Sequence, residues 1–328
     1  MEDPLIFLTG VAMLLAIGIG ANDETFAPLT GSKRLTVNQA VVMGGSIVII
    51  GAVILGFKVA KTVGSGITST IFDTNQILVI LFSVSIALIL GSWKGLPLST
   101  THAMVGATIA LTIIIGKADT VNVEVVYKIL ASWIISPVIG FVGSFLVMKG
   151  ILRLKRWYIK GLDDVDRLET YFSYGLLIAV SVTAFSRGGN DVSNAVAPIL
   201  PSYILLYEER SLMARIPLFL GGICMAIGLI VIGRRVLKTL GNDIVELSPT
   251  TALSVQSSTA IVTFVAAFIG IPISGTHVLV SSFVGTGIAA KSNVNMNTVK
   301  KIAVSAVFTP IFSGIIVFTL WQLFKLWS

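Results

Sequence analysis

The segment Gly270–His277 reads GIPISGTH and lies in the middle of an apolar stretch that runs from Thr250 to Ala290. Proline in such a stretch removes a backbone donor and clashes with the preceding turn, so it ends a helix. The hydroxyl and small residues that follow it make a polar turn in otherwise apolar sequence. Irregular backbone at membrane depth is tolerated only where protein buries it or where it lines a watery cavity. This segment therefore predicts a sharp polar turn inside a membrane protein.

The composition of the whole chain agrees with a membrane protein. Of its 328 residues, 55% are hydrophobic and 12% are charged, and the mean hydropathy is +0.94. Soluble domains carry about 25% charged residues, so too few polar groups remain here to cover a water-facing surface. An ordinary soluble enzyme and a disordered chain are both excluded. The single cysteine, Cys224, excludes a disulfide framework and a cysteine-based metal site.

A membrane helix needs about 20 mostly apolar residues, and apolar runs of this kind follow one another along the chain. No long polar stretch separates them, so no soluble domain is expected beside the membrane part. The predicted runs are Leu5–Ala21, Val37–Phe57, Gln76–Trp93, Leu98–Ile115, Val123–Val147, Tyr171–Phe185, Val192–Leu206, Ile216–Gly233, Thr250–Gly270, Ile271–Ala290 and Ile302–Leu323.

The longest polar connection, Lys149–Thr170, lies near the middle of the chain and is rich in Lys and Arg. Basic residues concentrate on the cytoplasmic side of membrane proteins, so this linker is predicted to be cytoplasmic. With the linker inside, 14 of the 23 basic residues fall on the cytoplasmic side and six on the other, and both termini face outside. The net charge of +7 is thus a topology signal, and nucleic acid is not an expected partner. We expect a multi-pass protein of the inner or plasma membrane.

Two motifs occur twice, in the same order. Gly20–Asp23 (GAND) is matched by Gly188–Asp191 (GGND), and Gly95–His102 (GLPLSTTH) is matched by Gly270–His277. The spacing between the copies is nearly constant and close to half the chain length. The chain is therefore predicted to contain two homologous halves, residues 1–148 and 171–328, joined by the linker 149–170.

The predicted topology gives each half an odd number of crossings, so the second half is inverted relative to the first. Each GxPxSxTH motif must then lie at the tip of a re-entrant hairpin, which leaves the membrane on the side it entered. The expected fold is an all-α polytopic membrane protein with two inverted-topology repeats, broken helices and re-entrant hairpins. Interrupted helices at corresponding positions of two halves point to the substrate site of a transporter.

Two carboxylates end long apolar runs beside Asn and Gly. An ionisable group at such depth is costly and is usually functional, although a pair of helix caps is the alternative. We favour a cation site that takes two monovalent cations, because the neighbouring glycines would free carbonyls that coordinate Na⁺ in broken-helix transporters. The predicted sodium ligands are Asn22, Asp23, Asn190, Asp191 and Gln256. No cofactor is expected besides sodium as the coupling ion.

The two hydroxyl turns, Ser99–Thr101 and Ser274–Thr276, have the composition of an anion site. Each turn begins a new helix, whose first N–H groups are unpaired and carry the positive end of the helix dipole. Ordinary N-capping by Ser and Thr is the alternative. We expect a tetrahedral oxyanion to be held by backbone N–H groups and hydroxyls from both turns. The predicted anion ligands are Ser99, Thr100, Thr101, Ser274, Gly275 and Thr276.

Further polar residues flank these motifs. His102 and His277 are expected to orient a neighbouring hairpin by hydrogen bonds, with proton transfer as the alternative. Ser186 and Asn194 flank the second Asn-Asp motif and are predicted as outer ligands. For Arg187, a gate and a residue at the membrane edge both remain open.

The motifs GAND and GGNDVSNA, together with the paired PxSxTH tips, resemble the inorganic phosphate transporter (PiT) family and, within it, the prokaryotic sodium-dependent symporters. The resemblance covers most of the chain. It implies an inverted-repeat fold, phosphate as substrate, and Na⁺ or H⁺ as coupling ion. It also implies that Asn22 and Asn190 contribute to phosphate binding, alongside the Asp residues and the hydroxyl turns.

The chain departs from the pattern of the family at three places. Glu24-Thr25-Phe26 stands where the repeated motif tends to read Val-Ala-Asn, so the two halves are expected to bind ions unequally. Gln256 stands where eukaryotic relatives often have Glu, which argues against an acidic or proton-linked role there. The large central soluble domain of some members is absent.

The sequence thus predicts a secondary active transporter, not an enzyme, that imports inorganic phosphate with sodium by alternating access. A proton-coupled phosphate or sulfate transporter and a passive anion channel are the alternatives. The expected partners are phosphate, sodium and the lipid bilayer, and a homodimer is left open.

Overall fold

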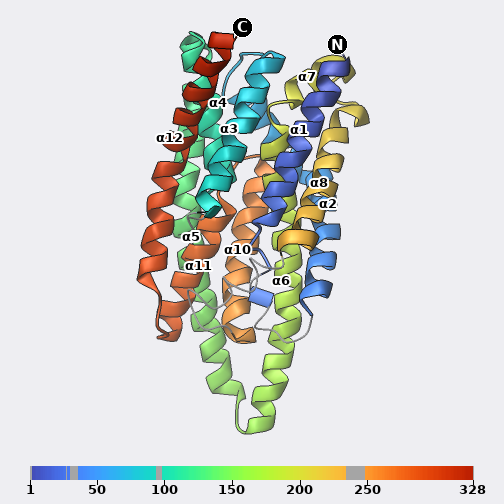
Figure 1. Cartoon of the computed structure of the whole chain (residues 1–328). Helices are drawn as coiled ribbons and strands as arrows, with labels where there is room; N and C mark the ends of the chain where they lie inside the picture. The colour runs from blue at the N-terminus through green and yellow to red at the C-terminus, as the bar shows by residue number, and fades with distance from the viewer. Residues whose placement is uncertain (1, 27, 30–35, 94–97, 234–247, 328) are drawn as a thin grey trace.

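A computed structural model describes residues 2–26, 28–29, 36–93, 98–233 and 248–327 (Figure 1). These residues are helical almost throughout, and no β-strand occurs among them. Eight of the described helices are long and apolar enough to cross a membrane. Large apolar side chains such as Ile134 and Val307 lie on the outer surface of the bundle, where lipid would surround them. The predicted class, an all-α polytopic membrane protein, is confirmed.

The described part of the first half contains five α-helices. They are α1 (Glu2–Ala21), α2 (Val37–Lys61), α3 (Thr74–Trp93), α4 (Thr100–Ile114) and α5 (Val123–Tyr158), with a π turn η2 (Thr62–Gly66) and a 3-10 turn η3 (Ala118–Thr120).

The described helices of the second half begin directly after the central turn. They are α6 (Leu162–Val196), α7 (Leu200–Tyr207), α8 (Ile216–Gly228), α10 (Pro249–Ile269), α11 (Gly275–Ala290) and α12 (Met296–Trp327), with short turns η4 (Leu212–Arg215) and η5 (Leu229–Gly233).

Both chain ends lie at one end of the bundle, and the turn between α5 and α6 lies at the opposite end (Figure 1). This relative placement agrees with the predicted topology, whose absolute orientation stays a prediction. The linker 149–170 differs from expectation, because α5 and α6 extend through most of it as a helical hairpin. Glu169 stabilises this hairpin: it pairs with Lys155 of α5 and accepts a hydrogen bond from the Thr250 hydroxyl at the start of α10.

The second Asn-Asp motif does not break a helix. The runs Tyr171–Phe185 and Val192–Leu206 were predicted as separate spans, but α6 continues through the motif to Val196. The glycines have a packing role instead: a Cβ atom on Gly188 would lie 2.2 Å from the Val48 carbonyl oxygen of α2. Small residues allow membrane helices to approach closely. The prediction that these glycines free carbonyls for an ion is therefore wrong for this copy.

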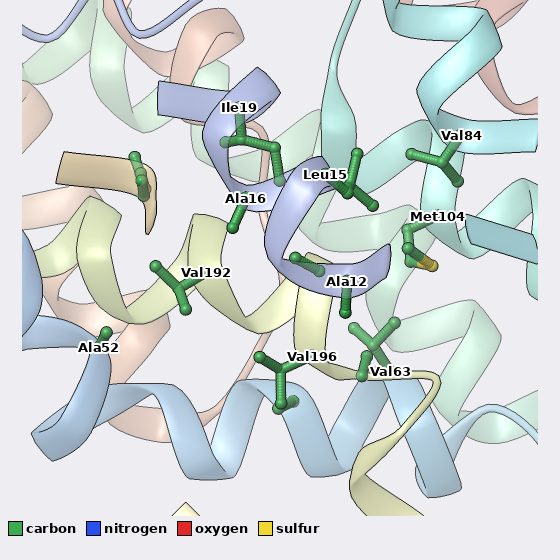
Figure 2. Packing of buried hydrophobic residues seen from close by; sticks show 14 of the residues in the cluster. Ala12, Leu15, Ala16, Ile19, Ala52, Val63, Val84, Met104, Val192 and Val196 are labelled. Atoms are coloured by element: carbon green, nitrogen blue, oxygen red, sulfur yellow. The ribbon is translucent and has the colours of Figure 1, made fainter. Parts of the chain in front are cut away.

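The largest buried cluster includes one side of α1, which packs against several other helices (Figure 2). Small side chains such as Ala12 and Ala16 let neighbouring helices approach it, and Leu15 and Ile19 fill the spaces between them. The partners come from both halves of the chain, including Met104 of α4 and, from α6, Val192 and Val196. The two halves therefore share one core.

Two helical hairpins meet inside the bundle. In the first, α3 leads to α4, and its tip residues Gly95-Leu96-Pro97 lie outside the described residues. In the second, α10 ends at Gly270, which adopts a left-handed conformation (φ +81°), and α11 begins after Ser274. The hydroxyl of Thr101 at the start of α4 donates to the Ile273 carbonyl of the second tip at 3.0 Å. The hairpin tips are thus in direct contact.

Candidate functional site

The two hydroxyl turns start their helices in the same way. Ser99 and Ser274 are the N-cap residues of α4 and α11, and each hydroxyl accepts a hydrogen bond from the backbone N–H of the histidine three residues on, at 3.4 and 3.3 Å. Such a cap satisfies one of the free N–H groups of a helix start. Both serines therefore act as N-caps, as the alternative interpretation predicted. They fix the backbone of the turns and leave the other N–H groups of the helix starts available.

Asn190 holds the second hairpin tip by its backbone. Its side-chain amide donates to the Ile273 carbonyl at 2.9 Å, and its amide oxygen accepts from the Ile273 N–H at 3.1 Å. Pro272 and the turn leave this residue outside regular helix, so its backbone groups need such a partner. The same Asn190 amide also donates to Asp191 at 2.8 Å. In this arrangement Asn190 positions the tip.

The first Asn-Asp motif forms a turn at the end of α1. Oδ1 of Asp23 accepts from the Thr25 N–H at 3.0 Å and from the Thr25 hydroxyl at 2.6 Å. Its other oxygen, Oδ2, is buried and has no hydrogen-bond partner among the described residues. Asn22 is exposed and donates to the Gly18 carbonyl. The end of α1 thus leaves Asn22 exposed beside the buried Asp23, and a role of Asn22 as a ligand stays a prediction.

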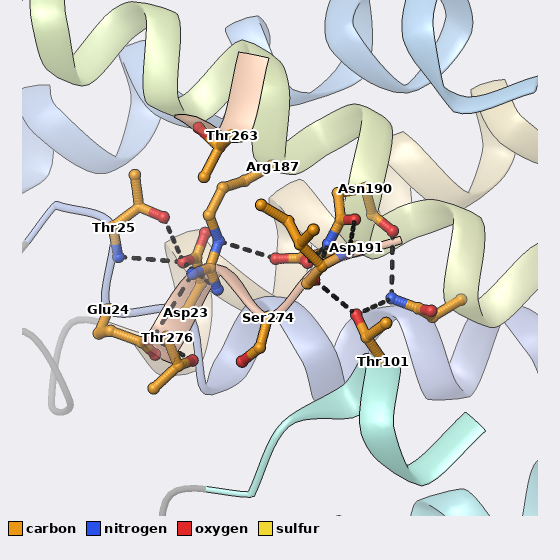
Figure 3. A network of polar contacts seen from close by, with 12 residues as sticks. Asp23, Glu24, Thr25, Thr101, Arg187, Asn190, Asp191, Thr263, Ser274 and Thr276 are labelled. Carbon is orange, nitrogen blue, oxygen red and sulfur yellow. Dashed lines mark hydrogen bonds and ion pairs between the residues drawn. The ribbon is translucent and has the colours of Figure 1, made fainter. Parts of the chain in front are cut away.

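A buried guanidinium joins the two Asn-Asp motifs (Figure 3). Arg187 forms ion pairs from Nη2 to Asp23 at 3.2 Å, from Nε to Asp191 at 2.8 Å, and from Nη1 to Glu24 at 3.5 Å. Its side chain is only 8% exposed. Buried charges are stable only when they are paired. Arg187 is therefore a buried ion-pair partner, and its three contacts favour a role within the site over one at the membrane edge.

The carboxylate cluster of Asp23, Glu24 and Asp191 also contacts the second hydroxyl turn. Thr276 donates its hydroxyl to Glu24 at 2.5 Å. A Cβ atom on Gly275 would lie 2.5 Å from Nη1 of Arg187, so only glycine lets the guanidinium lie against this turn. Glu24 was not among the predicted sodium ligands. An arginine at membrane depth needs acidic partners, but Glu24 is 163 residues away in the chain, so the sequence did not indicate that the two pair.

Gln256 and Asn194 link this cluster to the neighbouring helices. The Gln256 amide donates to the Thr25 carbonyl at 2.8 Å, and its oxygen accepts from Thr183 at 2.9 Å. Asn194 donates to the Thr101 hydroxyl at 3.0 Å, and its buried Oδ1 has no partner in the described part of the chain. Ser186 donates to a carbonyl of its own helix. Gln256 thus lies beside the carboxylates rather than among them.

The two histidines lie close together in the first turns of α4 and α11, directly after the hydroxyl turns. Their ring centroids are 4.9 Å apart, and the His102 ring stacks on Trp133 at 3.7 Å. Nδ1 of His102 lies 3.0 Å from the Ala306 carbonyl of α12. Pro310, four residues on, has no N–H to offer that carbonyl, so His102 replaces the missing donor. This contact supports the expected orienting role.

The arrangement places hydroxyls, helix N-termini, amides and a paired carboxylate cluster in one buried region formed by both halves. Helix N-termini and hydroxyls favour anions, and buried carboxylate oxygens favour cations. A site of this composition can hold an oxyanion and cations side by side.

Comparison with known proteins agrees with this chemistry. Residues 19–317 match the model of the phosphate transporter family. The chain is 28% identical to a predicted phosphate permease of Pyrococcus furiosus, over 96% of this chain and 95% of the relative. It is 27% identical to the chloroplast inorganic phosphate transporter 2-1 of Arabidopsis thaliana, over 96% of this chain and 71% of that protein.

A solved structure shares the fold. A protein described as the sodium-dependent phosphate transporter matches with a TM-score of 0.87 and 24% identity, over 99% of this chain and 100% of the other. The match extends over both hairpins and all the helices described above.

Proposed function

The chain belongs to the phosphate transporter family, and on that basis we propose that it imports inorganic phosphate by symport with sodium. It is a transporter and not an enzyme. One observation carries the proposal: the two hydroxyl turns contact each other, and the carboxylate cluster contacts the second of them. Anion and cation ligands are therefore close enough to bind together.

The hydroxyl turns are the proposed phosphate site. Their helix starts offer N–H groups and positive dipole ends without a permanent ion pair. Thr100, Thr101, Gly275 and Thr276 would line the phosphate, while the N-cap serines hold the turns in shape. A site built from dipoles and hydroxyls binds less tightly than a bidentate guanidinium, which keeps release feasible. Asn22 is not part of this proposal, since its side chain is exposed whereas the other ligands lie in the buried region.

Sodium is proposed to bind at the carboxylate cluster. Asp23, Glu24, Asp191 and Arg187 together carry a net formal charge of −2 in a buried region. Oδ2 of Asp23 and Oδ1 of Asn194 are buried acceptors without partners among the described residues, and each suits a hard cation. The sodium dependence stated for the protein of similar fold supports this choice of ion.

The coupling follows from charge. Sodium at the carboxylates lowers the cost of admitting phosphate next to them, and phosphate in turn tightens sodium, because coupling between two sites is reciprocal. Movement of the hairpins relative to the other helices would then open the loaded site to the cytoplasm, as in other transporters with broken helices.

Uptake of labelled phosphate into proteoliposomes tests the proposal, with sodium and pH gradients imposed separately. We expect accumulation against the phosphate gradient when sodium is higher outside at equal pH. Accumulation driven by a proton gradient without sodium would contradict sodium coupling. Strong competition by sulfate would contradict phosphate as the preferred substrate, and equilibration without accumulation would identify a passive channel.

A further inference from the structure

We propose that Arg187 is a built-in cation of the transport site, which takes the place of one sodium ion and so sets how many sodium ions move with each phosphate. The inference rests on the proposed symport function. It assigns to this side chain a part in the ion stoichiometry that goes beyond stabilising the helix bundle.

The guanidinium of Arg187 lies where a cation shared by the two Asn-Asp motifs would lie. Arg187 contacts Asp23 through Nη2 and Asp191 through Nε, and these carboxylates belong to the two copies of the Asn-Asp motif. A free cation shared by the two motifs would occupy the same space between them. Because the guanidinium is attached to α6 and remains charged in proteins, this positive charge cannot leave with the transported ions.

Glu24 balances the positive charge of Arg187 in the carboxylate cluster. It follows Asp23 directly, lies 3.5 Å from Nη1 of Arg187 and accepts the Thr276 hydroxyl. Asp23 and Asp191 alone would give the cluster a charge of −2, and Glu24 with Arg187 adds one charge of each sign. Without Arg187 the buried charge becomes −3, and without Glu24 it becomes −1. An uncompensated buried charge is costly. The number of sodium ions bound is therefore expected to change with the net charge of the four side chains.

Asp23 shows that the guanidinium leaves room for a mobile cation. Its Oδ1 contacts Arg187 and accepts a hydrogen bond from Thr25. The other, Oδ2, is buried and has no hydrogen-bond partner among the described residues. The fixed cation therefore satisfies part of the cluster, and an acceptor oxygen remains for an ion that enters from solution.

Four proteins test the inference: the wild type, Arg187→Gln, Glu24→Gln and the double variant. The sodium gradient that just balances a given phosphate gradient in proteoliposomes gives the number of sodium ions per phosphate. We expect one more sodium ion in Arg187→Gln, one fewer in Glu24→Gln, and the wild-type number in the double variant. Arg187→Lys keeps the charge and is the matched control, with an unchanged number.

A purely structural ion pair predicts a different pattern. Both single variants would then lose stability, and every active variant would keep the wild-type stoichiometry, which would overturn the inference. Where a variant folds but does not transport, sodium bound at equilibrium is counted with the labelled ion instead. Should Arg187→Gln not fold, an unchanged count in Glu24→Gln is sufficient to overturn it. A wild type that is not driven by sodium refutes the proposed function itself, which is a separate result.

Discussion

The two Asn-Asp motifs are nearly identical in sequence but differ in structure. Gly20–Asp23 ends α1, whereas Gly188–Asp191 lies inside the continuous helix α6. The difference follows from what each carboxylate contacts. Asp23 accepts the N–H of Thr25 and so competes with the helix for its backbone. Asp191 is held by Arg187, one turn earlier on the same helix, and leaves the backbone ladder intact. A duplicated motif therefore conserves a charge without conserving a local conformation.

The asparagines of the motifs differ as well. Asn190 is buried and holds Ile273 of the second hairpin tip, while Asn22 is exposed and bonds within its own helix. The second half of the chain thus supplies both the cation and the amide that organise the site, and the first half supplies two of the three carboxylates. The unequal ion binding expected from Glu24-Thr25-Phe26 stays a prediction, and this asymmetry of contacts supports it.

The largest effect is expected where the two copies are alike. Asp23→Asn and Asp191→Asn should each abolish sodium-driven phosphate uptake, because each variant removes a proposed sodium ligand of the duplicated motif as well as a buried partner of Arg187. Breaking a buried ion pair costs about 3–5 kcal/mol. Uptake into proteoliposomes and thermal unfolding of the purified protein measure the two consequences. Normal uptake in both variants, with protein present in the membrane, would contradict the assignment.

Replacing the asparagine of each Asn-Asp motif should have different effects in the two copies. Asn190→Ala should destabilise the second tip by about 3 kcal/mol, since the buried Ile273 N–H loses its partner and Asp191 loses a donor. Asn22→Ala, the matched control, should change stability and uptake little, because Asn22 is exposed. Thermal unfolding and phosphate uptake are compared for the pair. Equal losses in both variants would show that the motifs are more symmetric than the structure indicates.

The hydroxyl turns differ at one position. Gly275 of the second turn corresponds to Thr100 of the first. Gly275→Ala places a methyl group against the Arg187 guanidinium and should cost about 2 kcal/mol, with a matching loss of uptake. Thr100→Ala adds no atom and serves as the control, which should keep most of the stability. A tolerated Gly275→Ala would mean that the guanidinium does not lie against this turn in the working protein.

The smallest effect is expected from single hydroxyls. Thr101→Val and Thr276→Val each remove one donor from the proposed phosphate site, worth about 1 kcal/mol or roughly a fivefold rise in the phosphate concentration for half-maximal uptake. Thr101→Ser and Thr276→Ser keep the hydroxyl and should behave like the wild type. The concentration dependence of initial uptake rates distinguishes the variants, and unchanged values for Val would argue against the hydroxyl turns as ligands.

Local signals in the sequence were sufficient for part of this architecture. Proline after an apolar run, followed by Ser three residues before His, predicted both the hairpin turns and the capping alternative for Ser99 and Ser274. Repetition of the motifs predicted that the turns would come together, as the bond from Thr101 to Ile273 shows. These features depend on neighbours a few residues apart and on the repetition of the two motifs in the sequence.

The remaining features depend on contacts between distant residues. The continuity of α6 through Gly188 follows from its packing against α2, which no local signal encodes. Arg187 and Glu24 stand far apart in the chain, so the sequence offered a lone arginine and a lone glutamate without indicating that they pair. Whether Asn22 or Asn190 faces the site was set by where each helix ends, and helix ends are the least certain part of such a prediction.

The bond between Thr101 and Ile273 has a mechanical consequence. It ties the start of one hairpin to the backbone of the other, and Asn194 holds the same hydroxyl from α6. A shift of one hairpin would therefore either move the other hairpin as well or break these hydrogen bonds. In the proposed symport mechanism, hairpins that move together would not open the site to both sides at once, and ions would not leak through it.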